Sequence, residues 1–268
     1  MSGVRLWSVF WMLVRYNVRS SLMYRGNFVM QQLLTVVLQV GQLFLIAAVL
    51  TQFRFIAGWT FGDLAFLIGL RLLAHGIYVF FCYSAITFVD SEVTGGAFIR
   101  HLVRPIPALL SFLCSGTNLA GMSNFAAGVF MVVLATALGA VHWTAARAGL
   151  LLLVVAAGAI IELSVYLAVA CTAFWTGNSS PLFGIVYETL GEQFLLYPLN
   201  IYNLTVQGLL TVVPLGFVNF YPAYAFLTLP AEPWSHWVRY SPLAAVAAFG
   251  LVWWLWRAGS GSYQGTGS

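Results

Sequence analysis

Three ionisable residues interrupt long apolar stretches of the chain, where a charge is costly. Arg71 and His75 lie one helical turn apart, and Glu162 stands within a later apolar run. A charged side chain at the centre of a membrane costs about 2.5–3.5 kcal/mol on insertion scales, so each of these residues needs a partner. Arg71 and His75 lie on one helix face, where both can meet Glu162. We expect a structural ion pair and keep a proton-sensitive gate as the alternative.

The remaining reactive residues form no recognisable catalytic or metal site. The chain has no lysine, so it cannot build the G-x-x-x-x-G-K-[ST] loop of nucleotide-hydrolysing proteins, and any ATP chemistry has to come from a partner. His75 and Cys82 lack further ligands at metal spacing. Cys82, Cys114 and Cys171 are far apart in apolar surroundings, which is typical of buried small side chains. We expect no catalytic residue, metal or cofactor in this chain.

Composition places these residues in a membrane protein. Of the 268 residues, 61% are hydrophobic and only 7% are charged, so the chain cannot cover itself with an ordinary soluble surface. Several uncharged stretches exceed the ~20 residues that cross a hydrocarbon core. The net charge of +4 fits an interfacial distribution of arginine better than contact with nucleic acid.

The apolar stretches predict an all-α integral membrane protein with six transmembrane helices. The first twenty-four residues carry arginines at helical spacing and predict an interfacial helix, with a merely basic tail as the alternative. The 36 uncharged residues from Ile106 to Val141 predict one long helix that starts near Pro107. Four prolines divide the last uncharged stretch, so we expect a crossing followed by a re-entrant segment at 215–232 before the last helix. The expected spans are 28–50, 64–89, 107–140, 148–176, 194–213 and 240–256.

Arginine counts predict the orientation. Six crossings put both termini on one side, together with seven arginines against three on the other side. The positive-inside rule then places both termini in the cytoplasm.

The loop from Val89 to Pro107 concentrates charge in a chain that otherwise has little. Two glycines allow a turn, a short helix can follow, and prolines stop it before the next span. We expect this loop to meet water or a protein. Its candidate contact residues are Glu92, Gly96, Arg100, His101, Leu102, Arg104 and Pro105.

Polar side chains form stripes on three of the expected spans. Lipid disfavours such stripes, so each should face another helix or a polar pathway. They can line a translocation route or form the seam between two chains, and both hold if the route follows the seam. The stripe residues are Gln32, Thr35, Gln39 and Gln42 on the first span, Ser115 and Asn118 on the third, and Asn200, Asn203 and Gln207 on the fifth.

The order of these features resembles the ABC type-2 transporter permeases over essentially the whole chain. The loop reads G-x-x-x-x-x-L-x-R-P after the second span. Three further motifs follow in the family's order, namely Tyr197-Pro198-Leu199-Asn200-Ile201-Tyr202, Val213-Pro214-Leu215 and Phe220-Tyr221-Pro222-Ala223. The sequence departs from the pattern in having Thr94-Gly95-Gly96 at the turn and no lysine.

The resemblance implies a bacterial cell-membrane exporter. Two permeases, identical or paired with a sister chain, would join two ATP-binding subunits, which bind the ATP and Mg. The 89–107 loop would be the coupling helix that docks on the ATPase. An outer gate would include Pro214, Phe220, Tyr221 and Pro222. Apart from the resemblance, the aromatic residues near the expected outer gate suit an amphipathic or lipid-like compound or a drug as cargo. The alternative is an ion-coupled secondary transporter that uses Arg71, His75 and Glu162; an intramembrane enzyme ranks third.

Overall fold

The computed structural model describes residues 3–23, 25–52, 55–229 and 236–263, and within them the fold is all-helical. The one β-type contact in these ranges is an isolated bridge between Ile56 and Trp59. The long helices are α1 (Gly3–Met23), α2 (Arg25–Gln52), α3 (Phe61–Tyr78), α8 (Ala120–Ala137), α9 (Ala145–Cys171) and α14 (Ser241–Ser262). The short ones are α4 (Ser84–Thr87), α5 (Val89–Thr94), α6 (Ile99–Leu102), α7 (Ala108–Leu113), α10 (Ala173–Thr176), α11 (Ser180–Gly184), α12 (Leu204–Val212) and α13 (Phe220–Ala223). Two π-helices, η1 (Val79–Tyr83) and η2 (Ile185–Gln193), continue α3 and α11, and 3-10 turns are η3 (Phe194–Leu196), η4 (Leu199–Ile201), η5 (Leu215–Phe217) and η6 (Trp237–Tyr240).

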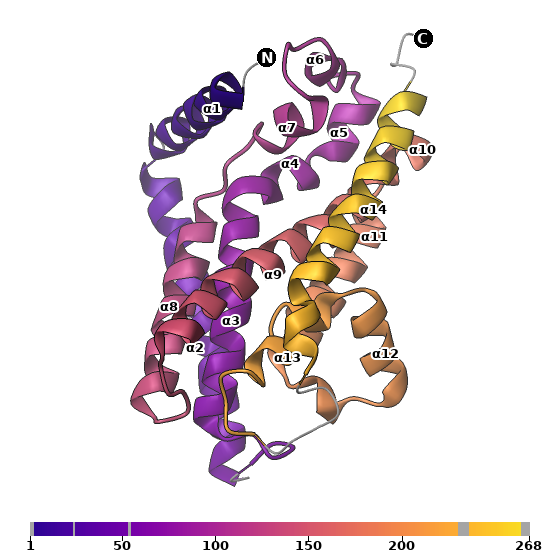
Figure 1. Cartoon of the computed structure of the whole chain (residues 1–268). Helices are drawn as coiled ribbons and strands as arrows, with labels where there is room; N and C mark the ends of the chain where they lie inside the picture. The colour runs from indigo at the N-terminus through magenta and orange to yellow at the C-terminus, as the bar shows by residue number, and fades with distance from the viewer. Residues whose placement is uncertain (1–2, 24, 53–54, 230–235, 264–268) are drawn as a thin grey trace.

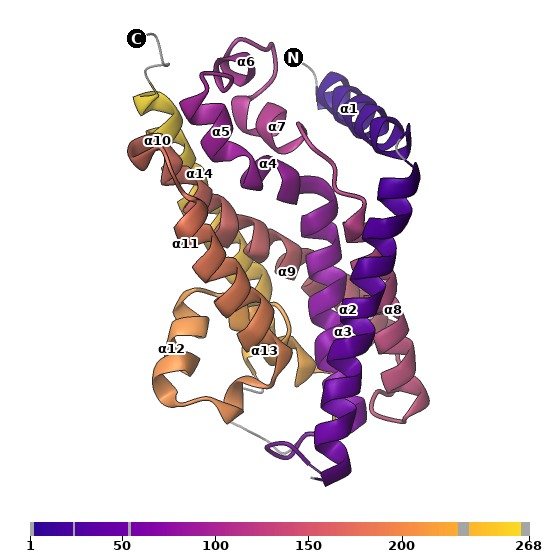
Figure 2. The ribbon, with the colours of Figure 1, turned by 180° about the vertical axis from the view of Figure 1, so that it is seen from behind.

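The long helices run between two ends of the molecule. One end carries α1, α5, α6, α7 and the last turn of α14, whereas the turn that joins α2 to α3 lies at the other end (Figure 1). In the view from behind, α2 and α8 lie next to α3 (Figure 2). The start of α1 and the finish of α14 thus lie at the same end, as an even number of crossings requires.

Four helical segments among the described residues are long and apolar enough to cross a membrane. They are Phe61–Thr94, Ala120–Ala137, Ala145–Thr176 and Trp237–Ser262. The first has 34 residues, which at 1.5 Å per residue is about 51 Å, so it exceeds a hydrocarbon core of about 30 Å. The expected span at 28–50 lies within α2, which has 28 residues. These lengths identify a multi-pass membrane protein; six crossings stay a prediction.

Local capping explains where two of these helices begin. Thr60 accepts a hydrogen bond from the backbone N–H of Asp63, and the Asp63 carboxylate accepts one from the backbone N–H of Thr60 at 2.9 Å. This reciprocal capping box fixes the start of α3. Thr144 caps α9 in the same way, with its hydroxyl accepting from the N–H of Arg147. Both signals are present in the sequence.

The expected single helix at 107–140 is wrong. The chain forms α7, breaks, and starts again at α8. The break is stabilised by Asn118, whose backbone N–H donates to the Phe80 carbonyl at 3.1 Å and whose side-chain oxygen accepts from the Ala120 N–H at 3.0 Å. Gly116 makes the close contact possible, since a Cβ there would lie 2.7 Å from the Cβ of Ser84. A tertiary contact therefore overrides an uninterrupted apolar run.

The expected continuous crossing at 194–213 is also wrong. The helix that packs against α9 starts at Ser180 and continues as η2 to Gln193, and the chain then turns through η3 and η4 before α12. The following Leu204–Val212 and Leu215–Ala223 segments meet at a bend of 78°. The predicted break in the segment 215–232 is present, although its last residues, 230–232, lie outside the described ranges. Whether this bent pair enters the membrane from one side and returns stays a prediction.

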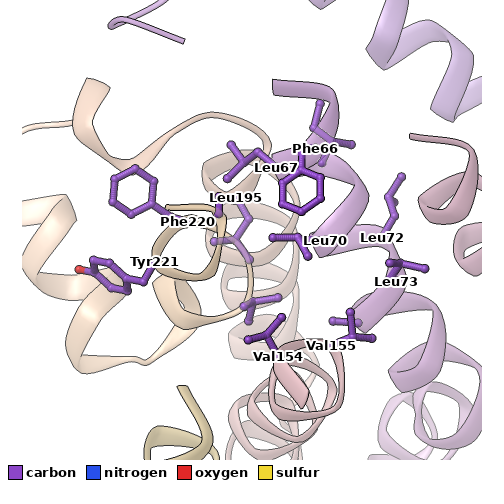
Figure 3. Packing of buried hydrophobic residues seen from close by; sticks show 14 of the residues in the cluster. Phe66, Leu67, Leu70, Leu72, Leu73, Val154, Val155, Leu195, Phe220 and Tyr221 are labelled. Carbon is purple, nitrogen blue, oxygen red and sulfur yellow. The ribbon is translucent and has the colours of Figure 1, made fainter. Parts of the chain in front are cut away.

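Helix α3 forms the centre of the core. Its residues are almost all buried, and it packs against α8 and α9. Figure 3 shows Phe66 and Leu67 of α3 facing Leu195 and Phe220. The approach of α8 depends on glycine, because a Cβ on Gly121 would lie 2.4 Å from the backbone nitrogen of Phe80.

Candidate functional site

The charged loop after the Phe61–Thr94 segment is a compact helical element at the end of the molecule that carries α1. Helix α5 ends at Gly95, and Gly96 turns the chain with a φ of +73°, a conformation that side chains with a Cβ rarely adopt. Helix α6 and then α7 follow. The predicted Gly-turn-helix pattern is therefore present, and Gly96 has the role of the turn.

A hydrogen-bonded cluster of four side chains, Glu92, Arg100, His101 and Ser111, fixes the inner face of this loop. The carboxylate of Glu92 bonds the guanidinium of Arg100 through one oxygen and His101 Nε2 at 2.8 Å through the other. His101 Nδ1 lies 2.9 Å from the Ser111 hydroxyl on α7. Glu92 and His101 are buried within this chain, and their predicted contact with a partner stays a prediction. They position the loop by joining α5, α6 and α7.

The outer face of the loop is exposed and mixes apolar and basic side chains. Leu102 and Arg104 are exposed as expected, and Pro105 lies beside them. Val103 is 74% exposed, and Ile99 adds a further apolar group that we did not predict. Apolar side chains held this far out on a rigid turn are typical of a surface that another protein covers. Exposure alone does not test the predicted ATPase contact.

Asp90 connects the loop to a distant part of the chain, and sequence reasoning missed this role. Its carboxylate accepts the backbone N–H groups of Ser179 at 2.8 Å and Ser180 at 2.9 Å, and both serine hydroxyls also bond to it. It thereby satisfies unpaired N–H groups at the start of α11. The sequence showed only an Asp near the end of one helix and an Asn-Ser-Ser-Pro segment at the start of another, about 90 residues later. No local sequence pattern indicates that these two sites are in contact.

The ionisable residues inside the bundle form a larger network than the sequence indicated. His75 Nδ1 lies 2.8 Å from Glu162 Oε2, as expected for that pair. Arg71 does not pair directly with Glu162; its Nη2 contacts Glu192 Oε1 at 2.6 Å. Glu192 also lies 3.5 Å from His75 Nε2, and the Tyr187 hydroxyl lies 3.3 Å from the same nitrogen. The network therefore links α3, α9 and η2.

Glu192 was missed because we took the uncharged stretch after it as the fifth crossing. Two glutamates in one segment argue against a membrane span by hydropathy. The positive charge of Arg71, which is 1% exposed, compensates the negative charge of one of them, Glu192. The η2 segment is a π-helix, a geometry found often at functional sites.

The polar stripe on α2 faces α8 of the same chain. Gln39 donates to Asn124 at 3.1 Å, Gln32 accepts from Ser123, and Gln31 donates to Asn118 at 3.3 Å. Intrachain hydrogen bonds thus account for much of the stripe. The Thr35 hydroxyl bonds within α2, whereas the Gln42 oxygen has no partner among the described residues.

Most residues of the other two stripes also make side-chain hydrogen bonds within the chain, and Ser115 is the exception. Asn203 caps α12 through the N–H of Val206 at 2.9 Å, Gln207 donates to the Tyr202 carbonyl at 2.8 Å, and Asn200 donates to the Ala57 carbonyl at 3.3 Å. Ser115 lies in the α7–α8 break, where it lines a hollow. A role of these residues in a pathway or an interface stays a prediction.

The residues expected at an outer gate lie in a buried aromatic cluster. Phe220 and Tyr221 belong to α13 with Pro222, and all three are buried. The Phe220 ring stacks on Trp59, with centroids 5.9 Å apart, and the Tyr221 hydroxyl lies 2.6 Å from the hydroxyl of Thr211. Pro214 precedes the 78° bend. The cluster closes the space between α12 and α3 in this conformation.

The geometry holds no obvious chemistry of bond making or metal binding. Across the described ranges, no group of three or more His, Cys, Asp or Glu side chains is arranged to hold a metal ion. The arrangement is suited to transmitting movement. It consists of an exposed loop, a buried polar network and a bent aromatic segment, and the long Phe61–Thr94 segment contacts all three.

Comparison with known families agrees with this layout. Residues 36–267 match the family model described as ABC-2 family transporter protein. The chain belongs to this family. Searches of curated proteins and of solved structures found no match. As an ABC-2 family transporter protein, the chain is a membrane-spanning component of a transporter, and the family implies association with ABC ATP-binding subunits.

The family match covers every feature described above except the first part of the chain. The loop, the ionisable network and the bent aromatic segment of this ABC-2 family protein all fall within 36–267, whereas α1 and the first turns of α2 precede it. The family does not favour the alternative of an ion-coupled secondary transporter.

Proposed function

We propose that this chain is the permease subunit of an ATP-driven exporter in a bacterial cell membrane, with both termini in the cytoplasm. Two such permeases, identical or sister chains, would form the pathway and join two separate ATP-binding subunits, which would bind ATP and Mg. Family membership and the absence of a lysine for a nucleotide-binding loop support this assignment.

The observation that carries the proposal is the two-sided character of the 89–107 loop. Its inner face is fixed by the Glu92 cluster, which Arg104 joins through a hydrogen bond to Ser111. Its outer face exposes Leu102 and Val103. A rigid element that is fixed to the permease on one side and exposed on the other can transmit the movement of a docked ATPase to the helices that it contacts.

Two rigid connections lead from the loop into the membrane-spanning part. Helix α5 is the last part of the long Phe61–Thr94 segment, which also contains Arg71 and His75. Asp90 fixes the start of α11, and α11 continues into η2 with Glu192. A movement of the loop would therefore act on both partners of the Arg71–Glu192 ion pair.

The cargo that we propose is an amphipathic or lipid-like compound or a drug. The aromatic cluster of Phe220, Tyr221 and Pro222 beside the bend would form the outer gate, and the opening of this cluster would separate α12 and α13 from α3. Export is the direction that the family resemblance suggests.

Co-purification tests the proposal. The tagged chain is extracted in mild detergent, and the accompanying ATP-binding subunit and its ATPase activity are measured. Leu102→Asp and Val103→Asp should abolish recovery of the subunit without lowering the amount of folded permease. Leu138→Asp is the matched control, since Leu138 is 52% exposed and caps the C-terminus of α8, which finishes at the other end of the molecule (Figure 1). Recovery of the permease alone after cross-linking in the membrane would contradict the proposal.

A further inference from the structure

A polar hollow lies between helix α1 and the neighbouring part of the bundle. Its volume is about 530 Å³, and it lies between α1, the α4–α5 region and the break that precedes α8. A second hollow of about 210 Å³ shares Ser21, Ser84 and Thr117 with it, so the two adjoin. Neither belongs to the coupling loop's outer face or to the ionisable network.

Most of the hydroxyl groups that line these hollows are unused; the exception is Ser91, which donates to the Phe88 carbonyl. Five of them, from Ser20, Ser21, Ser84, Ser115 and Thr117, make no side-chain hydrogen bond to any residue in the described ranges. They come from three separate parts of the chain and converge on one space. Each hydroxyl is a donor as well as an acceptor, so the space offers a shell of hydrogen-bond donors to an occupant.

One guanidinium adds positive charge to this shell. Arg100 lines the larger hollow, and its Nη2 atom donates to the Glu92 carboxylate. A guanidinium carries five N–H donors, so several stay available on Arg100. Both oxygens of the Glu92 carboxylate already accept hydrogen bonds from Arg100 and His101, which limits the repulsion of an anion. Hydroxyl and guanidinium donors together suit the oxygens of a phosphate group.

The hollow also adjoins one end of a segment that is apolar enough to cross a membrane, and lipid head groups lie at the ends of such segments. The Ala120–Ala137 segment begins three residues after Thr117, so the hollow adjoins the end of that apolar stretch. Arg15 and Arg19 are exposed on α1, the helix that forms one side of the hollow, and add attraction for anionic lipid. We propose that this hollow binds the phosphate-bearing head group of an anionic phospholipid from the leaflet on which α1 lies. This proposal does not depend on transport or on an ATPase.

Lipid retention measured by native mass spectrometry tests the site. The full chain is purified from nanodiscs that contain equal amounts of phosphatidylglycerol and phosphatidylcholine. The wild type should retain phosphatidylglycerol preferentially. The Ser84→Ala, Thr117→Val double variant should lose this preference roughly tenfold, because hydrogen bonds to a charged group are among the stronger ones in proteins. Thr205→Val, at an exposed position on α12 at the other side of the bundle, should leave it unchanged.

Three results would overturn the proposal. Equal retention of the two lipids by the wild type would show that the hollow holds only water. An equal loss in Thr205→Val would show that the preference arises elsewhere. Displacement of phosphatidylglycerol by excess inorganic phosphate would assign the site to free phosphate instead of a lipid. Thermal unfolding of each variant separates loss of the site from loss of the fold, and Thr117→Val alone, which preserves side-chain shape, supplies a milder second variant.

Discussion

Replacement of Glu192 by glutamine should destabilise the folded permease far more than the same change at Glu188. Glu192 contacts the buried guanidinium of Arg71 at 2.6 Å, and Arg71 is 1% exposed. Two unit charges at this distance attract by about 6 kcal/mol at an effective dielectric constant of about 20. Removal of one partner of a buried pair leaves the other charge uncompensated and typically costs about 3–5 kcal/mol. The Glu192 side chain is 30% exposed, so we expect the lower end, about 3 kcal/mol.

Glu188 provides the matched control, since it lies four residues earlier on the same π-helix and makes no hydrogen bond or ion pair to a described residue. Glu188→Gln should change stability by less than about 0.5 kcal/mol. The free energy of unfolding of each variant is measured by denaturation in mixed micelles. Arg71→Met combined with Glu192→Leu should recover most of the loss, because an apolar pair replaces the charged one.

Two results would refute this account of the network. Equal stabilities of Glu192→Gln and Glu188→Gln would show that Arg71 does not depend on Glu192. Additive effects of Arg71→Met and Glu192→Gln, within about 0.5 kcal/mol, would show that the two side chains do not interact.

Three further predictions concern packing and local hydrogen bonds. Gly121→Ala should lower stability by more than about 2 kcal/mol in thermal unfolding, because its Cβ would lie 2.4 Å from a backbone nitrogen of η1; Gly149→Ala, with nothing within 4 Å, should be neutral or slightly stabilising. Asp90→Ala should cost about 2 kcal/mol and speed hydrogen exchange in the first turn of α11, and unchanged exchange there would contradict its capping role. Tyr221→Phe should cost about 1 kcal/mol, and a Thr211→Val background should remove that cost, since the two hydroxyls bond each other at 2.6 Å.

The sequence predicted the class of the fold and the existence of most long helices. Apolar runs at 28–50, 64–89, 148–176 and 240–256 all lie largely in helices, because backbone that crosses a membrane must satisfy its hydrogen bonds internally. The breaks were harder to place. Residues 107–140 read as one helix, yet Asn118 and Gly116 interrupt it through contacts with residues more than 30 positions away.

The candidate site, like the fold, was only partly predictable from the sequence. Sequence patterns indicated that Arg71, His75 and Glu162 need partners and that the 89–107 loop is a distinct element, and they led to the family. They did not show that Glu92 and His101 face inward, since burial of a loop side chain depends on what folds over it. They also did not show that Asp90 caps α11.

By itself, the sequence determined that this protein is a helical membrane protein, and its 268 residues include no lysine for a nucleotide-binding loop. Those conclusions follow from composition and from residue types, which do not change when the chain folds. Only the tertiary structure decided which carboxylate meets Arg71, where α7 and α8 separate, and which hydroxyls converge beside α1. Each of these depends on contacts between residues tens to more than a hundred positions apart, and periodicity along one segment carries no information about the segment that packs against it.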